Sequence, residues 1–234
     1  MNRKLRNIVE SYMCKVPDVK IYCDRCLRTE RWDGNPIAML VDASFTSIGL
    51  NYFYSVVPGV QDFIKIFIQS GRIRSFEDLT NIDTQGLTVI WKNKRSWHLA
   101  KSVAAYFTEL KKINVINDRQ SFILWAKISS LERWQDDPVG KIKGVGINTY
   151  QYLRMMGGID TIMPDKIVKR VINNMLLEAG EEIPTTEMDF IKMVEYLGQA
   201  VGYRPIELCW MTWLVQSESN IIRLEKYSNI LSKI

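Results

Sequence analysis

Residues 141–149 read Lys-Ile-Lys-Gly-Val-Gly-Ile-Asn-Thr, and residues 163–171, one helix-length further on, read Met-Pro-Asp-Lys-Ile-Val-Lys-Arg-Val. A Gly-Val-Gly turn between two helical segments exposes backbone N–H groups beside a helix N-terminus, which is a favourable place for a phosphate group. The second stretch puts a carboxylate, Asp165, at the start of the next helix. The two stretches together predict an enzyme that holds a nucleic-acid backbone and acts on the sugar beside it.

The apolar pattern of the chain is helical nearly throughout. Apolar residues recur every three or four positions in segments 96–113, 118–128 and 166–178, which is the spacing of one helix face. Further helix starts are expected near Ser75, Pro184 and Pro205. No stretch alternates convincingly between apolar and polar residues, so the predicted fold class is all-α.

Composition agrees with a globular protein that has an anionic partner. The 234 residues are 47% hydrophobic, enough for a sizeable core, and 31 Lys and Arg against 26 Asp and Glu give a formal net charge of +5. Basic residues gather around the two stretches, at Lys141, Lys143, Lys166, Lys169 and Arg170. They predict contacts to phosphate groups, and the alternative is an ordinary solvated face.

The cysteine pattern favours a reducing compartment. Cysteines at 14, 23, 26 and 209 do not form a disulfide framework in a chain of this size, and no signal peptide is apparent. Cys23 and Cys26 have zinc-type spacing, but a second pair is missing and the only histidine, His98, is distant in the sequence. We therefore expect no metal site and a cytoplasmic protein, associated with the nucleoid if prokaryotic.

No segment is predicted to cross a membrane. The longest weakly charged run, residues 43–61, is interrupted by Ser, Thr, Asn, Gly and Pro, so it is better interpreted as a buried helix with its exit loop. The chain contains no long low-complexity tract or internal repeat. A monomer without a membrane partner is expected.

The two stretches resemble the helix-hairpin-helix (HhH-GPD) DNA glycosylase superfamily. Its members carry a Leu-Pro-Gly-Val-Gly-x-Lys/Ser-Thr-Ala hairpin followed by a Val-Asp-Thr-His-Val-x-Arg-Val segment. Gly144, Val145, Gly146 and Thr149 match the hairpin, and the second part is matched by Asp165, Ile167 or Val168, Arg170 and Val171. Residues 36–47 also look like the family's Leu-Leu-Ser-x-Gln-x-Thr helix, so the resemblance spans roughly residues 36–175.

The resemblance implies two helical lobes on either side of a cleft. Residues 36–134 would form the central lobe, and residues 1–35 with 135–234 would form the second. The second lobe would carry the helix-hairpin-helix at about 139–157 and the segment 163–171, with Asp165 facing the cleft. Several members hold an iron–sulfur cluster on four closely spaced C-terminal cysteines. This chain has only Cys209 there, so no cluster and no other cofactor is predicted.

Asp165 is the predicted catalytic residue. Breaking an N-glycosidic bond builds positive charge on the sugar, and a carboxylate beneath the sugar stabilises that charge or directs water to it. Its alternative role is a helix N-cap, and the two roles are compatible. Bifunctional members use a lysine at the position of Asn148 as an amine nucleophile; an amide cannot serve, so a monofunctional enzyme is expected.

Predicted DNA contacts lie at the hairpin and at the start of the following helix. They are Lys141, Lys143, Gly144, Val145, Gly146, Thr149, Lys166 and Lys169. The family's glutamine on the first central helix is replaced by Ser44, so Ser44 and Asp42 are candidates for a pocket that reads a flipped-out base. The alternative to a pocket role is that Ser44 lies in the helix core and Asp42 on the helix surface.

The resulting hypothesis is a hydrolase of base-excision repair. It would act on double-stranded DNA, releasing a damaged or mismatched base with an Asp-assisted water. Two alternatives remain: a non-catalytic DNA-binding module, and another specificity on the same scaffold, such as a bifunctional glycosylase with abasic-site lyase activity or a glycosylase acting on undamaged bases.

Overall fold

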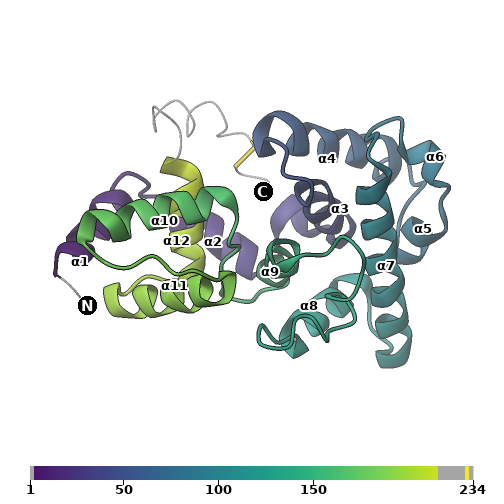
Figure 1. Ribbon diagram of the computed structural model, residues 1–234. Coiled ribbons are helices and arrows are strands. Elements are labelled where there is room, and N and C mark those ends of the chain that lie inside the picture. Colours follow the sequence, from purple (N-terminus) through teal and green to yellow (C-terminus); the bar gives the residue numbers. More distant parts are fainter. Residues whose placement is uncertain (1–2, 216–229, 232–233) are drawn as a thin grey trace. The chain divides into compact units, whose positions relative to one another are not determined.

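The computed structural model describes residues 3–215, 230–231 and 234. These residues form α-helices and short 3-10 or π-helical segments and contain no β-strand (Figure 1). The predicted all-α fold is confirmed.

The chain divides into two compact units. Unit 1 consists of Met1–Arg28 and Ile159–Ile234, and unit 2 is the continuous segment Thr29–Gly158. The predicted boundaries at 35 and 134 differ from these, because residues 29–35 and 135–158 group with unit 2. The cause is packing: the helix that follows the glycine turn contacts two helices of unit 2.

Unit 2 is built around one long helix, α7. Its elements are η1 (Arg31–Gly34), α3 (Pro36–Thr46), η2 (Tyr52–Val56), α4 (Val57–Phe63), η3 (Ile64–Ile68), α5 (Phe76–Asn81), α6 (Thr84–Leu87), α7 (Lys94–Asn114), α8 (Asp118–Ile128) and α9 (Ile147–Met156). Helices α3, α5, α6 and α8 pack against α7, and α9 packs on α3 and α8. In Figure 1, α7 stands upright with α5 and α6 beside it.

Aromatic side chains fill the core of unit 2. Phe45 of α3 stacks on Trp91 with ring centroids 4.0 Å apart and meets Trp97 of α7 edge-on at 4.9 Å. At the other side of α7, Trp125 of α8 meets Phe107 at 5.5 Å and Tyr150 of α9 at 5.5 Å. Large rings that bury most of their surface contribute strongly to a core, so this chain of contacts ties α3, α7, α8 and α9 into one body.

Unit 1 is a smaller helical cluster drawn from two parts of the sequence. Its elements are α1 (Arg3–Met13), α2 (Val19–Leu27), α10 (Lys166–Ala179), α11 (Glu187–Val201) and α12 (Pro205–Val215). Helix α12 is the centre, since α1, α2, α10 and α11 all contact it, and α1 also packs on α10. The buried face of α12 includes Leu208, Cys209 and Met211.

Local sequence signals set most helix boundaries. Asn93 caps α7 by accepting hydrogen bonds from the N–H groups of Arg95 and Ser96, and Ser75 caps α5 as predicted. Gly180 ends α10 in the left-handed region at φ 80°. The helices predicted at 96–113, 118–128 and 166–178 are confirmed as α7, α8 and α10.

Two features bear on the expected partners. Within the described ranges, no helix has both the length and the apolar character needed to cross a bilayer. Cys23, Cys26 and Cys209 are buried in unit 1, and burial raises the pKa of the Cys23 thiol. Among the residues that the structure covers, no three His, Cys, Asp or Glu side chains are grouped so that they could hold a metal ion.

Val115 ends α7 in a strained conformation, which yields a stability prediction. Its φ of 52° lies in the left-handed region and its side chain is 91% exposed, so a β-branched residue is held there without packing compensation. We expect Val115→Gly to raise the free energy of unfolding by about 1 kcal/mol in urea titrations. The control is Val89→Gly at an exposed valine without positive φ, which should lower it. Equal effects of the two substitutions would contradict the strain at Val115.

Candidate functional site

The glycine turn is a compact loop that leads into α9. Gly144 has φ +100°, a region that L side chains rarely adopt, and the N–H of Val145 donates to the carbonyl of Ile142 at 2.9 Å. Gly146 is the N-cap residue of α9, and no side chain caps that helix end. Val145 is buried and anchors the turn, while Gly144 and Gly146 are exposed. The backbone at both glycines is therefore accessible to a ligand.

The segment before the turn differs from the prediction. A helix-hairpin-helix at 139–157 needs a helix on each side of the turn, but residues 131–144 form successive turns and bends, and only α9 is helical. Asp137 explains this, because its Oδ1 accepts the N–H of Val139 at 2.8 Å and the indole N–H of Trp125 at 3.1 Å. A carboxylate that takes local backbone donors competes with helix formation.

Gly140 keeps this segment closely packed. A Cβ atom at Gly140 would lie 1.7 Å from the carbonyl oxygen of Trp134, a distance that no side chain could accept. Residues 134–140 are thus held against one another, and this fixes the approach to the turn.

The side chains predicted around the turn divide into exposed and buried groups. Lys141 and Lys143 are exposed, as phosphate contacts require, whereas Thr149 is buried and faces the core. Asn148 is half-buried, and its Oδ1 is buried with no hydrogen-bond donor among the described residues. A buried acceptor of this kind is costly unless a water or a ligand supplies a donor.

A second basic segment, missed by the sequence reasoning, lies beside the turn. A Cβ atom built on Gly144 would be 3.7 Å from Cδ1 of Leu99, so the turn rests against the first part of α7. Arg95 is exposed one helical turn before Leu99, and Lys92 and Lys94 are exposed next to it in the sequence. The sequence shows this basic cluster as Lys92-x-Lys94-Arg95. Only the packing of α7 against the turn shows that the cluster lies near Gly144.

Asp165 caps α10. Its Oδ1 accepts hydrogen bonds from the N–H groups of Ile167 and Val168, each at 2.8 Å. The N-cap alternative is thus confirmed for this residue, and Oδ1 carries both cap bonds. Pro164 precedes it and is buried, while Asp165 itself is half-buried.

The environment of Asp165 perturbs its ionisation. Burial raises the pKa of the carboxyl above the ordinary aspartate value, against the opposing effects of the two backbone donors, the Trp213 side chain and the charge of Lys169. A raised pKa at a partly accessible carboxyl is typical of functional sites, although structural groups show it too.

The lysines predicted beside Asp165 lie on α10. Lys166 is exposed, while Lys169 is half-buried and its Nζ forms an ion pair with Glu187 at 3.2 Å. Lys166 has the exposure that a phosphate contact needs, whereas part of the charge of Lys169 is used within unit 1.

The proposed base-pocket residues are inside unit 2. Asp42 and Ser44 have no exposed surface, and the Ser44 hydroxyl donates to the carbonyl of Leu40 within its own helix at 2.7 Å. A base would have to enter the interior of unit 2 to meet either side chain. The alternative prediction, that Asp42 is an aspartate on the surface of its helix, is also wrong, because Asp42 is buried.

Asp42 is instead the centre of a buried polar cluster. Its Oδ2 accepts from the guanidinium of Arg31 at 3.1 Å, the indole N–H of Trp32 at 2.7 Å and the hydroxyls of Tyr52 at 2.9 Å and Tyr152 at 3.1 Å. Burial raises the pKa of both tyrosines, so they act as neutral donors. Because Tyr152 lies on α9, the cluster fixes the helix that follows the glycine turn.

The predicted residues thus fall into two sets. The turn, its lysines and Asn148 lie together in unit 2, and Asp165 with Lys166 and Lys169 lies at the start of α10 in unit 1. Neither family models, nor curated proteins, nor solved structures show a match to this chain. The chemistry of the two sets therefore has to be judged from their own geometry.

The cap role of Asp165 gives a prediction about stability and pH. Asn caps helices about as well as Asp, so Asp165→Asn should keep the wild-type free energy of unfolding at pH 7, whereas Asp165→Ala should lose about 1 kcal/mol. The pKa of Asp165 is raised above 3.8 in the folded state. Between the pKa of the unfolded state and that of the folded state, the folded protein therefore binds more protons than the unfolded chain. Wild-type stability should fall as pH rises through that window, and the Asn variant should lack this fall.

Urea titrations at a series of pH values, from below the ordinary aspartate pKa up to neutral pH, measure both effects. An Asp165→Asn variant as unstable as Asp165→Ala would contradict the observed cap geometry.

Proposed function

We propose that the protein is a monofunctional DNA glycosylase that hydrolyses the N-glycosidic bond of a damaged or mismatched base. Asp165 carries the proposal. It is a partly accessible carboxylate held rigidly at a helix N-terminus, its pKa is raised by burial, and its two cap bonds both use Oδ1. Oδ2 makes neither cap bond, so it is the oxygen that we assign to the substrate.

The chemistry follows from charge development. As the base leaves, its sugar becomes cationic, and a fixed carboxylate in surroundings of low polarity stabilises that state more strongly than water does. The same carboxylate can orient the water that attacks the sugar. Since the cap fixes the side chain before substrate arrives, Asp165 needs no reorganisation during the reaction.

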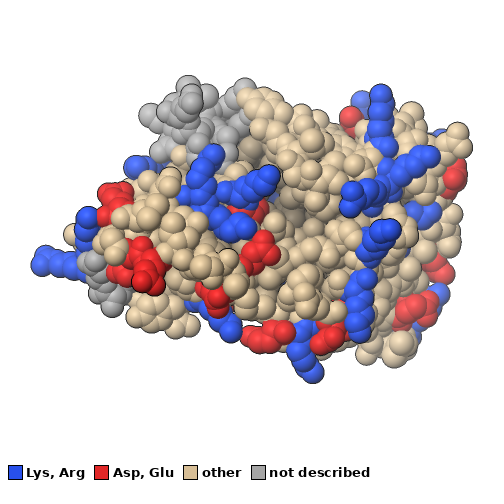
Figure 2. Space-filling model, viewed as in Figure 1, with Lys and Arg blue, Asp and Glu red and all other residues tan. Residues whose placement is uncertain are grey.

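The glycine turn supports the DNA part of the proposal. The exposed backbone at Gly144 and Gly146, the uncapped start of α9 and the exposed Lys143 suit a phosphate of the strand. In Figure 2, basic side chains form a column over the part of unit 2 where Figure 1 draws α4 and α7. Lys92, Lys94 and Arg95 are exposed at the start of α7, the part of that helix against which the turn rests.

Water, rather than an amine, is the proposed nucleophile. Asn148 stands where an amine nucleophile would be needed, and an amide nitrogen does not form a Schiff base. Its buried Oδ1 is instead a hydrogen-bond acceptor, which a donor on a bound strand or a water could satisfy. The product should be an intact strand with an abasic site.

A non-catalytic DNA-binding module is the second candidate. The cap bonds of Asp165 favour it, because they explain an aspartate at this position without any chemistry. The two candidates differ in whether Asp165 is needed for base release.

The decisive experiment is base release from labelled duplexes that carry a panel of damaged and mismatched bases, with heat and alkali to reveal abasic sites. Asp165→Asn should lower the rate about a hundredfold or more, since it removes the charge but keeps the cap. The matched control is Asp18→Asn, at the exposed N-cap of α2 in the same unit, which should leave the rate unchanged. Full turnover by folded Asp165→Asn would reject the assignment.

The fate of the strand separates the enzyme classes. Wild-type product should be cut only after alkali, and borohydride should trap no protein on the DNA. A trapped adduct that disappears on mutation of one lysine would place the protein among lyases. Absence of base release on every duplex, with binding intact, would favour the non-catalytic module.

Strand binding should depend on bare backbone at the turn. A Cβ atom at Gly146 would meet no heavy atom within 4 Å, so Gly146→Ala fits the fold while obstructing a strand, and duplex affinity should drop about tenfold. Gly86→Ala is the matched control, because Gly86 in α6 also has open space around its Cβ position. Fluorescence anisotropy with duplex DNA measures both, and equal affinities would show that the strand does not approach Gly146.

The salt dependence of binding tests the basic side chains. Lys143→Ala and Arg95→Gln should each reduce the log–log salt slope by about 0.9, which corresponds to one lost phosphate contact on duplex DNA. Lys112→Ala is the control, since Lys112 is exposed at the far end of α7, about 25 Å from Arg95 along the helix. An unchanged slope for Arg95→Gln would show that the start of α7 makes no phosphate contact with the strand.

A further inference from the structure

Unit 1 contains a cavity of about 330 Å³ between α10, α11 and the start of α1. Helices α10 and α11 both pack on α12, and the cavity lies between their second halves. None of its lining residues belongs to the glycine turn or to the segment around Asp165, so it is a separate feature of the molecule. Its walls are mostly apolar and are formed by Leu5, Leu176, Met193, Tyr196 and Leu197.

Two carboxylates, those of Glu181 and Glu182, also line the cavity, and the end of α10 places them there. The N–H of Gly180 donates to the carbonyl of Leu177 at 3.0 Å. The N–H of Glu181 donates to the carbonyl of Leu176 at 2.9 Å. In a helix ending of this kind, the residue after the glycine frequently makes an apolar contact with the last turn. Here that residue is a half-buried glutamate, so a carboxylate lies against the apolar wall.

The surroundings of the cavity are acidic, although the whole chain has a formal net charge of +5. Residues 171–191 contain five carboxylates and no lysine or arginine, and the described lining includes no basic side chain. In Figure 2, acidic side chains lie together on the face of unit 1 where Figure 1 draws α10 and α11. The ion pairs that the structure shows in unit 1 use other carboxylates, those of Glu10, Asp24, Glu187 and Glu207. Within the described residues, Glu181 and Glu182 are therefore available to a cation.

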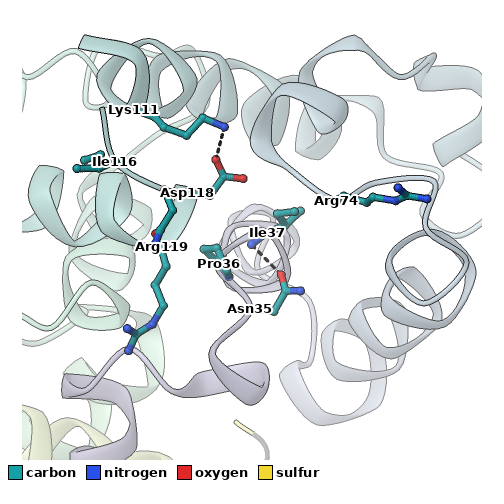
Figure 3. A pocket seen from close by; sticks show the side chains of 9 residues that line it. Asn35, Pro36, Ile37, Arg74, Lys111, Ile116, Asp118 and Arg119 are labelled. Atoms are coloured by element: carbon teal, nitrogen blue, oxygen red, sulfur yellow. Dashed lines mark hydrogen bonds and ion pairs between the residues drawn. The ribbon is translucent and has the colours of Figure 1, made fainter. Parts of the chain in front are cut away.

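The depression in unit 2 at the start of α3 and α8 is larger, about 570 Å³, but its charged groups do not converge (Figure 3). Arg74 and Arg119 point away from each other on either side of Pro36. Lys111 already pairs with Asp118 at 2.7 Å. The acidic cavity of unit 1 is thus the better candidate for a charged partner.

Apolar surface continues from the cavity to the outside of unit 1. Tyr196 lines the cavity and is 60% exposed. Leu177 and Ile183, each next to a lining residue in the sequence, are 60% and 38% exposed. Exposed apolar surface with a polar rim is typical of a site that binds another macromolecule. A small molecule of the cavity's size would leave Leu177 and Ile183 uncovered, whereas a segment of another protein would cover them.

The charge of this surface selects the class of partner. Carboxylates repel nucleic acids and anionic lipid headgroups, so neither complements an acidic rim. A segment with apolar residues on one side and lysine or arginine on the other complements both the cavity and its rim. A helix with this pattern places apolar side chains into a groove at three- and four-residue spacings.

We propose that the groove formed by this cavity and its rim binds a basic amphipathic helix of a partner protein. An apolar side chain of that helix fills the cavity between Leu176 and Met193, and its lysine or arginine side chains contact Glu181 and Glu182. The inference does not depend on glycosylase activity.

Fluorescence anisotropy with three labelled synthetic peptides tests the proposal. The first is a helical peptide of leucine and lysine with leucine at every third or fourth position, the second has glutamate in place of lysine, and the third has serine in place of leucine. The leucine–lysine peptide should bind. The serine peptide should bind at least about tenfold more weakly, because apolar burial is lost, and the glutamate peptide should not bind measurably.

Two variants of the protein separate the charged and apolar parts of the groove. Glu181→Gln/Glu182→Gln should bind the leucine–lysine peptide about tenfold more weakly, since two ionic contacts are lost. Met193→Gln, at a half-buried wall residue, should weaken binding by about the same factor without a change in charge. Circular dichroism checks that both variants are folded.

The matched control is Asp62→Asn/Asp83→Asn, which changes the net charge equally at two exposed aspartates of unit 2 and should bind the peptide like the wild type. Equal losses in the two double variants, an unchanged affinity of Met193→Gln, or no binding of the leucine–lysine peptide by the wild type would overturn the proposal. So would binding of 2-phenylethylamine that Glu181→Gln/Glu182→Gln abolishes while peptide binding persists, because this would identify a site for small organic cations.

Discussion

A carboxylate without solvent exposure has to be matched by donors, because removing one partner of a buried ion pair costs about 3–5 kcal/mol. Asp42 is such a group, and its partners Arg31, Trp32, Tyr52 and Tyr152 come from positions 10 to 110 residues away in the sequence. Satisfying one oxygen therefore joins η1, α3, η2 and α9 at a single point. The chain accepts left-handed backbone at Trp32, with φ 51°, to bring the indole there.

This constraint explains why the glycine turn belongs to unit 2. Tyr152 draws α9 onto α3 through the Asp42 cluster, and Tyr150 places the opposite side of α9 against Trp125. With α9 held on two sides, the turn that precedes it has a defined position relative to the start of α7. The surface on which Lys143 and Arg95 lie is a consequence of that packing.

Local features of this protein could be predicted, and features that depend on distant partners could not. Helices α7, α8 and α10, and the caps at Ser75 and Asp165, follow from residue spacing and from side chains within three positions. The burial of Asp42 could not be predicted, because its partner Tyr152 is 110 residues away and the pattern around 42 is compatible with either face of a helix. For the same reason, the sequence could not predict that Leu99 lies next to Gly144.

Unit 1 is one compact unit made from two separate parts of the sequence. The whole of unit 2 lies between them, from the residue after Arg28 to the residue before Ile159. Helices α1 and α2 can meet α10 and α12 only after the intervening segment closes a loop, and closing a long flexible loop is entropically unfavourable. A compact, already folded unit 2 shortens that loop. Connectivity thus separates two kinds of contact: α10, the helix that carries Asp165, can meet α12 without that loop, whereas its contact with α1 requires the loop over unit 2 to close.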